Sequence, residues 1–154
     1  MTHRVPAAIS AALLLAANAP APAPAPGSGH VLTIDVTNIR NGKGMVHVDV
    51  CRQAEFLKDC AIVNDTKSAP GTTRIVVRDL PSGVYAIQAT HDENSNHKVD
   101  RGLFGIPKEG VGFSNDAPIR FGPPSWKDAE FQVSGDRTVT LKMRYFSGPS
   151  GPAR

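Results

Sequence analysis

The sequence predicts an all-β domain, an antiparallel β-sandwich of the immunoglobulin or transthyretin-like kind, with six or seven short strands and one long loop. Three observations support this fold class. Apolar and polar residues alternate in several short runs, turns rich in Gly, Pro and Asn separate these runs, and no segment keeps helical periodicity for more than a turn or two. Parallel α/β architecture is excluded because its crossover helices are missing.

Length and composition indicate a single globular domain. The chain has 154 residues, of which 40% are hydrophobic and 20% are charged, and this is enough for one core but not for two. We predict that the folded domain spans residues 30–146 and that residues 147–154 form a flexible tail.

Residues 1–19 have the pattern of a secretory signal peptide. A positively charged start, ending at Arg4, precedes an uncharged run rich in Ala and Leu over 5–19, which is too short to span a bilayer. Cleavage after Ala19 is the simplest expectation, but Pro20 follows at once. Cleavage after Ala17 or near 27–29, and an uncleaved anchor, therefore remain alternatives.

The mature chain is expected to begin with a spacer. Ala-Pro repeats and a Gly-Ser-Gly stretch over 20–29 lack the apolar side chains for a core and predict an extended, polyproline-like segment. Together with the signal peptide, this predicts a bacterial protein that is periplasmic or secreted.

Cys51 and Cys60 are the only cysteines. In an oxidising compartment, an even pair this close in sequence predicts a disulfide. The alternative, a two-cysteine metal site, lacks a histidine in the intervening segment 52–59. A helical turn over 53–57 is expected inside the disulfide loop.

The alternating runs predict two hairpins and two strands between them. Runs 32–37 and 46–50 flank the turn at 41–44 and should pair with each other, and runs 129–133 and 139–145 should pair about Gly135 and Asp136. Between them, 72–78 forms a strand with Ile75 and Val77 inward, and 84–91 forms one with Tyr85, Ile87 and Ala89 on one face. The turn at 80–83 joins these two strands, and Gly83 would tolerate a positive φ there.

The connection 92–124 has little alternation and is too long for an ordinary loop, which predicts a functional segment. Its sharpest motif is 92–100, where side-chain oxygens recur at alternate positions as in a calcium loop. The predicted ligands are Asp92, Asn94, Asn96, the carbonyl of Lys98, and Asp100, and Glu93, Glu109 or Asp116 could complete the shell. The alternative is an Asx-rich β-turn without an ion, because position 6 is His97 rather than Gly and position 12 is Leu103 rather than Glu.

Histidines offer a second metal hypothesis. His47, His91 and His97 could meet as a transition-metal site, although solvated strand histidines are the commoner arrangement. No other cofactor is indicated.

Aromatic residues in and after the long loop predict a groove for a sugar or a peptide. The predicted binding residues are Phe104, Phe113, Arg120, Phe121 and Trp126, and Arg101 and Lys108 are interspersed with them. The alternative is that these aromatic side chains are the loop's own core.

No catalytic residues are predicted. The sequence has no Gly-x-Ser-x-Gly elbow, no free Cys beside a His and no zinc-protease helix motif. We therefore expect that the protein is not an enzyme.

Several motifs resemble the bacterial family called domain of unknown function 2141. They are Gly83-Val84-Tyr85, His91-Asp92-Glu93-Asn94 with Asn96 and Asp100, Gly105-Ile106-Pro107-Lys108-Glu109, Gly112-Phe113-Ser114-Asn115 and Phe121-Gly122-Pro123-Pro124. The resemblance covers about residues 31–145 and implies an exported β-sandwich with no assigned activity. Members commonly have Asn-x-Asn-Gly where this chain has Asn94-Ser95-Asn96-His97.

The function expected from these features is non-catalytic binding of a small ligand or an envelope partner through 92–124, with Ca²⁺ as the candidate ion that orders this loop. The alternatives are a purely structural cell-envelope module and a small hydrolase acting on glycans. The formal net charge of +3 falls to about +2 without Arg4, and the basic residues are scattered. Neither nucleic-acid binding nor a transmembrane span in the mature domain is predicted.

Overall fold

The computed structural model describes residues 29–151. The predicted signal peptide 1–19, all of the predicted spacer except Gly29, and the last three residues of the predicted tail lie outside the described residues.

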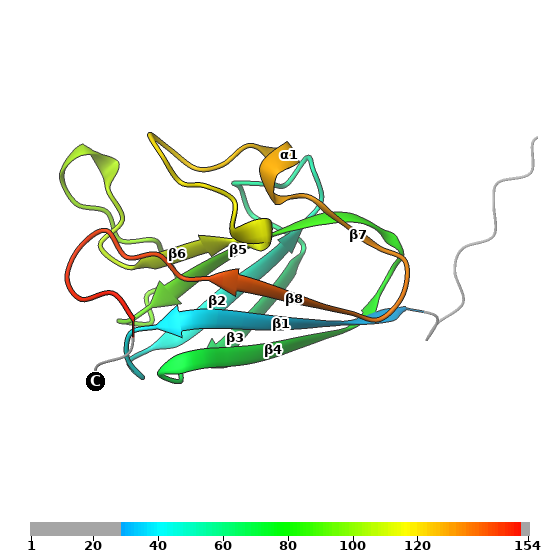
Figure 1. Cartoon of the computed structure of the whole chain (residues 1–154), viewed down its shortest axis with the longest axis horizontal. Helices are drawn as coiled ribbons and strands as arrows, with labels where there is room; N and C mark the ends of the chain where they lie inside the picture. Colours follow the sequence, from blue (N-terminus) through cyan, green and yellow to red (C-terminus); the bar gives the residue numbers. More distant parts are fainter. Residues whose placement is uncertain (1–28, 152–154) are drawn as a thin grey trace, which may run out of the picture.

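The described chain forms two sheets (Figure 1). Its strands are β1 (His30–Ile39), β2 (Met45–Cys51), β3 (Ile62–Lys67), β4 (Gly71–Leu80), β5 (Gly83–Asp92), β6 (Gly110–Phe113), β7 (Phe131–Val133) and β8 (Arg137–Lys142). The only helical segments within 29–151 are short, namely η1 (Leu103–Gly105), η2 (Ser114–Asp116) and α1 (Trp126–Ala129). A β-sandwich is thus the observed fold, and it matches the predicted fold class.

One sheet has the order β4-β1-β8, and the other has the order β3-β2-β5-β6 with β7 also paired to β5. Strands β6 and β7 share one edge of β5: β7 pairs with Gly83–Tyr85, and β6 pairs with Gln88–His91. All ladders are antiparallel except β1–β8, which is parallel. This one parallel pair departs from the purely antiparallel sandwich that the sequence predicted.

Both predicted hairpins are wrong. Strand β1 pairs with β4 and β8, whereas β2 pairs with β3 and β5, so the turn at 41–44 joins the two sheets. The turn near Gly135 likewise connects β7 in one sheet to β8 in the other. Alternation specifies which face of a strand is buried but not which strand lies beside it. The runs predicted to be neighbours therefore face each other across the core.

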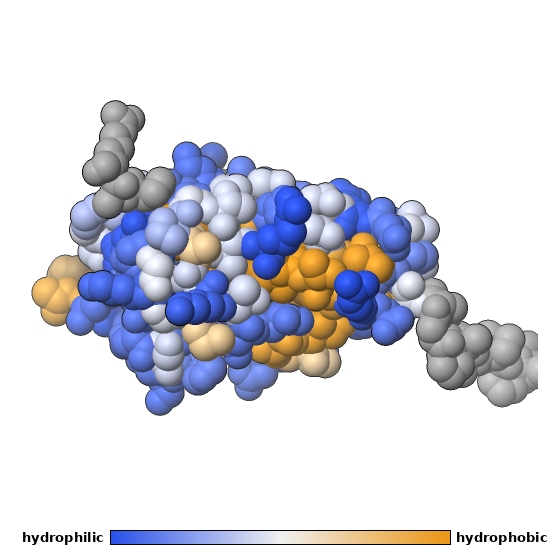
Figure 2. Space-filling view, turned by 90° about the horizontal axis from the view of Figure 1, so that it is seen from below, coloured by the Kyte–Doolittle hydropathy of each residue, from blue (hydrophilic) through white to orange (hydrophobic). Residues whose placement is uncertain are grey.

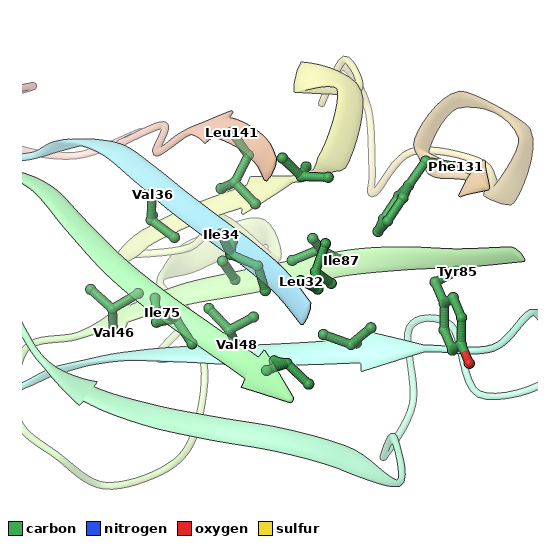
Figure 3. Close-up of a cluster of buried hydrophobic side chains, with 14 of the residues drawn as sticks. Leu32, Ile34, Val36, Val46, Val48, Ile75, Tyr85, Ile87, Phe131 and Leu141 are labelled. Carbon is green, nitrogen blue, oxygen red and sulfur yellow. The ribbon is translucent and has the colours of Figure 1, made fainter. Parts of the chain in front are cut away.

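The core lies between the sheets and is built by the predicted inward faces (Figure 3). Ile75 and Val77 on β4 and Tyr85, Ile87 and Ala89 on β5 are all buried, as predicted. Removing a side chain such as Ile87 from water contributes roughly 1.5–3 kcal/mol to folding. The strong alternation in these strands is thus explained by burial of one face of each sheet.

Glycine on β6 lets the two sheets approach at one end. A Cβ at Gly112 would lie 2.8 Å from Leu141 Cδ1, and a Cβ at Gly110 would lie 2.6 Å from Met143 Cγ. Because these two glycines face inward, their neighbours Val111 and Phe113 face outward. At the turn before β5, however, the positive φ belongs to Asp79 rather than to Gly83.

A second, smaller cluster packs on the outside of the five-stranded sheet. It contains the disulfide between Cys51 and Cys60, which the sequence predicted, together with Phe56 and Phe113. The helical turn predicted at 53–57 is present only as a hydrogen-bonded turn, in which the Phe56 N–H donates to the carbonyl of Arg52, and it ends at Leu57 with a φ of 65°. The buried Ser114 hydroxyl donates to the Ala129 carbonyl and accepts the Ile87 N–H, which ties the long loop to β5.

Figure 2 shows the sandwich from below, on the side where β4 and β3 lie. The main apolar area of this face lies right of the centre of the view and reaches its lower edge, and a smaller one lies at the left edge. Within residues 29–151, no helix has the length and apolar character needed to cross a membrane.

Candidate functional site

The outer face of the five-stranded sheet forms the floor of a cleft. His47 and Asp49 on β2 pair with Thr90 and Gln88 on β5, and these pair in turn with Val111 and Phe113 on β6. Paired residues point to the same side of a sheet. All six side chains therefore face away from the core, and all six line the cleft.

Three loops wall this floor and enclose a volume of about 930 Å³. The walls come from the disulfide loop at 57–60, from 97–107 after β5, and from 119–123 before α1. The last two rise from the same side of the sandwich in Figure 1. The volume is near the upper end of the range that encloses drug-sized ligands.

The segment 100–108 is a small protruding excursion. Lys108 N–H donates to the carbonyl of Asp100 at its base, and Gly102 N–H donates to the carbonyl of Ile106 nearer its tip. Its tip is η1, where the side chain of Phe104 is 96% exposed. An apolar side chain of that size is thus held at the rim of the cleft rather than in a core.

The predicted aromatic binding residues are divided between packing and the cleft. Phe113 and Trp126 both pack edge-on against Phe56 in the second cluster, and Phe113 also lines the floor of the cleft. Phe104, Arg120 and Phe121 are exposed and line the cleft. Arg101 also lines it, whereas Lys108 does not.

The predicted calcium residues form a tight polar loop. The buried Asp92 carboxylate accepts the N–H groups of Asn96 and His97 at 3.1 and 2.7 Å. The Asp100 carboxylate accepts the side-chain amides of Asn94 and Asn96. Asn96 Oδ1 in turn accepts the Lys98 N–H. His97, at the place of a calcium loop's glycine, has a φ of 57°. The calcium role of these residues stays a prediction.

Of the three carboxylates expected to complete that loop, one reaches it. The buried Glu109 accepts the Glu93 N–H at 3.0 Å and the Asp100 N–H at 3.2 Å. Its pKa is raised by burial, and nearby Asp92 and Asp100 raise it further.

The other two carboxylates are engaged elsewhere. Glu93 binds Arg40, with Nε donating to Oε1 at 2.7 Å, and Asp116 accepts the Lys142 N–H on β8. The Arg40 hydrogen bond, with help from Asn41, lowers the pKa of Glu93 to about 2.

Two of the three histidines considered as metal ligands come together. His47 and His97 have ring centroids 6.4 Å apart, and Asp65 on β3 lies between them. His91 points into the interior instead, where Nδ1 is 2.7 Å from the Tyr145 hydroxyl and Nε2 is 3.0 Å from the Lys43 carbonyl. Burial lowers the pKa of His91.

His47 lies between two carboxylates on the cleft floor. Its Nδ1 is 2.7 Å from Asp65 Oδ1, and its Nε2 is 3.2 Å from Asp49 Oδ1. The hydrogen bond to Asp49, followed by the one to Asp65, raises the pKa of His47 to about 9. The imidazole is therefore protonated at neutral pH.

Comparison with family models places the chain in one bacterial family. The family described as Uncharacterized protein conserved in bacteria (DUF2141) matches residues 34–141. The chain belongs to the DUF2141 family. No curated protein and no solved structure matches the chain.

The region matched to DUF2141 runs from the middle of β1 to the end of β8, one residue short of its last residue, and includes almost the whole cleft. Phe146 is the one lining residue outside it. The cleft is thus built almost entirely by the matched DUF2141 region.

Sequence reasoning missed Asp65 and the disulfide-loop wall. Strand β3 was not predicted, because its exposed positions Val63, Asp65 and Lys67 include both apolar and charged residues and obscure the alternation. No local pattern marked Asp65, because it comes to lie opposite His47 only when β3 pairs with β2.

Proposed function

We propose that the domain is an exported, non-catalytic binding module whose cleft takes a small ligand with an apolar body and an acidic group. The observation that carries this proposal is the cleft of about 930 Å³ on the outer face of the five-stranded sheet. A concave site of this size with apolar walls and a few polar groups is the usual form of a small-molecule site.

The apolar part of the ligand is assigned to the rim. Phe104 and Phe121 are almost fully exposed, and Ile106 is 48% exposed. Leaving such side chains in water is unfavourable by about 25 cal/mol per Å² of apolar surface. A ligand that covers them recovers that free energy on binding.

The acidic group is assigned from the charges in the cleft. Lys98 and Arg120 line it, and within residues 29–151 their side chains have neither a hydrogen bond nor an ion pair. The carboxylates of Asp49 and Asp92, by contrast, already accept hydrogen bonds, and the third lining carboxylate, Asp59, belongs to the wall formed by the disulfide loop. An anion at this wall would meet cations that are available for pairing.

Export is supported by the Cys51–Cys60 disulfide, because such bonds persist in oxidising compartments. The apolar, uncharged run at 5–19 supports it from the sequence. The purely structural envelope module remains the alternative that an unoccupied cleft would favour.

A fluorescence titration of the protein with anilinonaphthalene sulfonate tests the binding proposal. We expect saturable binding of one probe, weakened at least tenfold by F104A/F121A and unchanged by Val84→Ala, an exposed apolar residue outside the cleft. Dodecanoate should displace the probe at lower concentration than dodecanol, and Arg120→Gln should remove that preference while Arg78→Gln should not.

If F104A/F121A and the control Val84→Ala changed the affinity for the probe equally, the cleft would be refuted as the binding site. Equal displacement by dodecanoate and dodecanol would refute the acidic group alone. An absence of probe binding would favour the structural module.

Glu109 favours a second proposal, that Ca²⁺ orders the segment 92–109. Its buried carboxylate ties the two ends of the loop and lies near two further carboxylates, Asp92 and Asp100. Oxygen ligands of this kind suit a hard cation, and an ion would offset their mutual repulsion. The side-chain oxygens of this segment are those that the sequence predicted, and Glu109 is one of the three carboxylates expected to complete the shell.

Thermal unfolding in EDTA, and then in a millimolar Ca²⁺ series, tests this second proposal. At tenfold excess over its dissociation constant the ion should stabilise the fold by about 1.4 kcal/mol. Mg²⁺ should not, and D100N/E109Q should abolish the shift while Asp59→Asn, an exposed residue elsewhere, keeps it. A melting temperature that Ca²⁺ leaves unchanged would reduce the segment to an Asx-rich turn.

A further inference from the structure

A group of three side chains beside the cleft has the composition of a transition-metal site. His47, Asp65 and His97 each offer one ligand atom, and these atoms all lie within 4.8 Å of one another. Within residues 29–151 this is the one group of three or more His, Cys, Asp or Glu side chains that are so close.

The fold brings the three residues together from separate segments. His47 on β2 and Asp65 on β3 are direct cross-strand partners, so their side chains point to the same face. His97 arrives from the loop after β5, where the buried Asp92 carboxylate accepts its N–H at 2.7 Å. That bond anchors the backbone of His97 next to the strand pair, while its side chain remains 60% exposed and free to rotate.

We propose that His47, Asp65 and His97 bind a divalent transition-metal ion such as Zn²⁺. Two imidazole nitrogens with one carboxylate are ligands that Zn²⁺ takes, whereas Ca²⁺ prefers oxygen ligands alone. Asp65 already lies between the two rings, with Oδ1 2.7 Å from His47 Nδ1 and Oδ2 3.8 Å from His97 Nδ1. Ligand atoms on one tetrahedral ion lie about 3.3 Å apart. The ion would therefore replace the proton between His47 Nδ1 and Asp65 Oδ1, with these two atoms moving apart, and a rotation of the exposed His97 ring would bring in the third ligand.

Asp49 supplies the outer contact that metal-binding histidines require. Its Oδ1 lies 3.2 Å from His47 Nε2, on the opposite side of the ring from Asp65. Gln88 donates to the other oxygen of Asp49 at 2.8 Å and holds the carboxylate in place. A carboxylate that accepts the second ring N–H of a ligating histidine orients the ring and makes it a better ligand. Asp49 is therefore a positioning residue for His47.

The site has an open side toward the cleft. His47 and His97 both line the cleft, while the three protein ligands leave at least one coordination position for water or for a ligand in the cleft. The metal proposal rests on the distances within the three-residue cluster and not on the proposed cleft ligand. A negative result in the metal titration and a negative result in the probe titration are therefore independent.

Titration of the full chain, without a histidine tag, with Co²⁺ and with Zn²⁺ tests the proposal. We expect one equivalent of Co²⁺ to give the visible absorption of a site with nitrogen and oxygen ligands, and Zn²⁺ to displace it. H97A, H47Q and D65N should each weaken Zn²⁺ binding at least tenfold by calorimetry. Asp49→Asn, which keeps the shape but not the charge, should weaken it by about 10- to 100-fold.

His30→Ala is the matched control, because His30 pairs with Ser82 rather than with any residue of the cluster. It should leave the affinity unchanged. His97→Ala decides the outcome independently of folding, since its side chain is mostly exposed and makes no hydrogen bond within the described chain. Zn²⁺ binding that is absent, or that persists unchanged in both H97A and D65N, would overturn the site.

Discussion

The two faces of the five-stranded sheet differ in almost every property. The inner face of β5 presents Tyr85, Ile87 and Ala89, all buried, whereas the outer face of the same strand presents Gln88 and Thr90, which are half-buried and line the cleft. The inner-face side chains of β5 thus contribute to the core, and its outer-face side chains contribute to the candidate site. Because the two sets alternate along the backbone, either can be changed while the other is kept.

The largest expected effect belongs to the inner face. Ile87→Ala removes a fully buried side chain from the middle of the core, and it should cost about 2–5 kcal/mol of the free energy of unfolding, measured in urea. Thr90→Ala, on the outer face of the same strand, is the control and should change it by less than about 0.5 kcal/mol. Equal costs would mean that the outer face also carries the fold.

The disulfide joins the two regions, since it lies in the second cluster and its loop walls the cleft. Replacing Cys51 and Cys60 together by Ala should cost about 2–3 kcal/mol on the chain-entropy estimate for so short a loop. Probe binding in the cleft should weaken as well, because Leu57 and Lys58 lose their constraint. A melting temperature equal to that of the oxidised protein would contradict this assignment.

Two charged groups, His47 on the outer face and Glu93 just after β5, should set the pH range of greatest stability. His47 has a folded pKa of about 9 against an ordinary value of 6.5, so its contribution is full below pH 6.5 and is lost as pH rises through 9. Glu93 has a folded pKa of about 2 against 4.5, so its contribution is full above pH 4.5 and is lost as pH falls toward 2.

The interactions of His47 with its carboxylates and of Glu93 with Arg40 are partly exposed to solvent. We therefore expect each of them to contribute at most about 1 kcal/mol to the free energy of unfolding. Urea unfolding at a series of pH values measures it. His47→Gln should flatten the alkaline side and leave the acidic side unchanged, and Glu93→Gln should do the reverse. An alkaline loss that persists in the His47 variant would assign that titration to another group.

The smallest effect on stability is expected at the rim. Phe104→Ala removes a side chain that contacts mainly water, and the free energy of unfolding should change by less than about 0.5 kcal/mol. Its effect should appear in ligand binding alone. A large loss of stability would show that the excursion at 100–108 supports the fold rather than the cleft.

The candidate site could be predicted only in part. The polar motif at 92–100 and the exposed side chains of Phe104, Arg120 and Phe121 lie where a functional loop was expected. Phe113 and Trp126 were indistinguishable from them in the sequence, because an aromatic residue suits a groove and a core equally well. Phe56, supplied by the distant disulfide loop, packs against both of them.

The sequence was enough to predict the fold class, the disulfide, and the buried side chains of β4 and β5, because alternation with a period of two is a local property. Which strands pair with each other is known only from the tertiary structure. It placed β1 and β2 in different sheets, made β1–β8 parallel, and set Asp65 between His47 and His97. Strand pairing depends on contacts between residues far apart in the chain, and a pattern that repeats identically in every strand carries no information about which two of them meet.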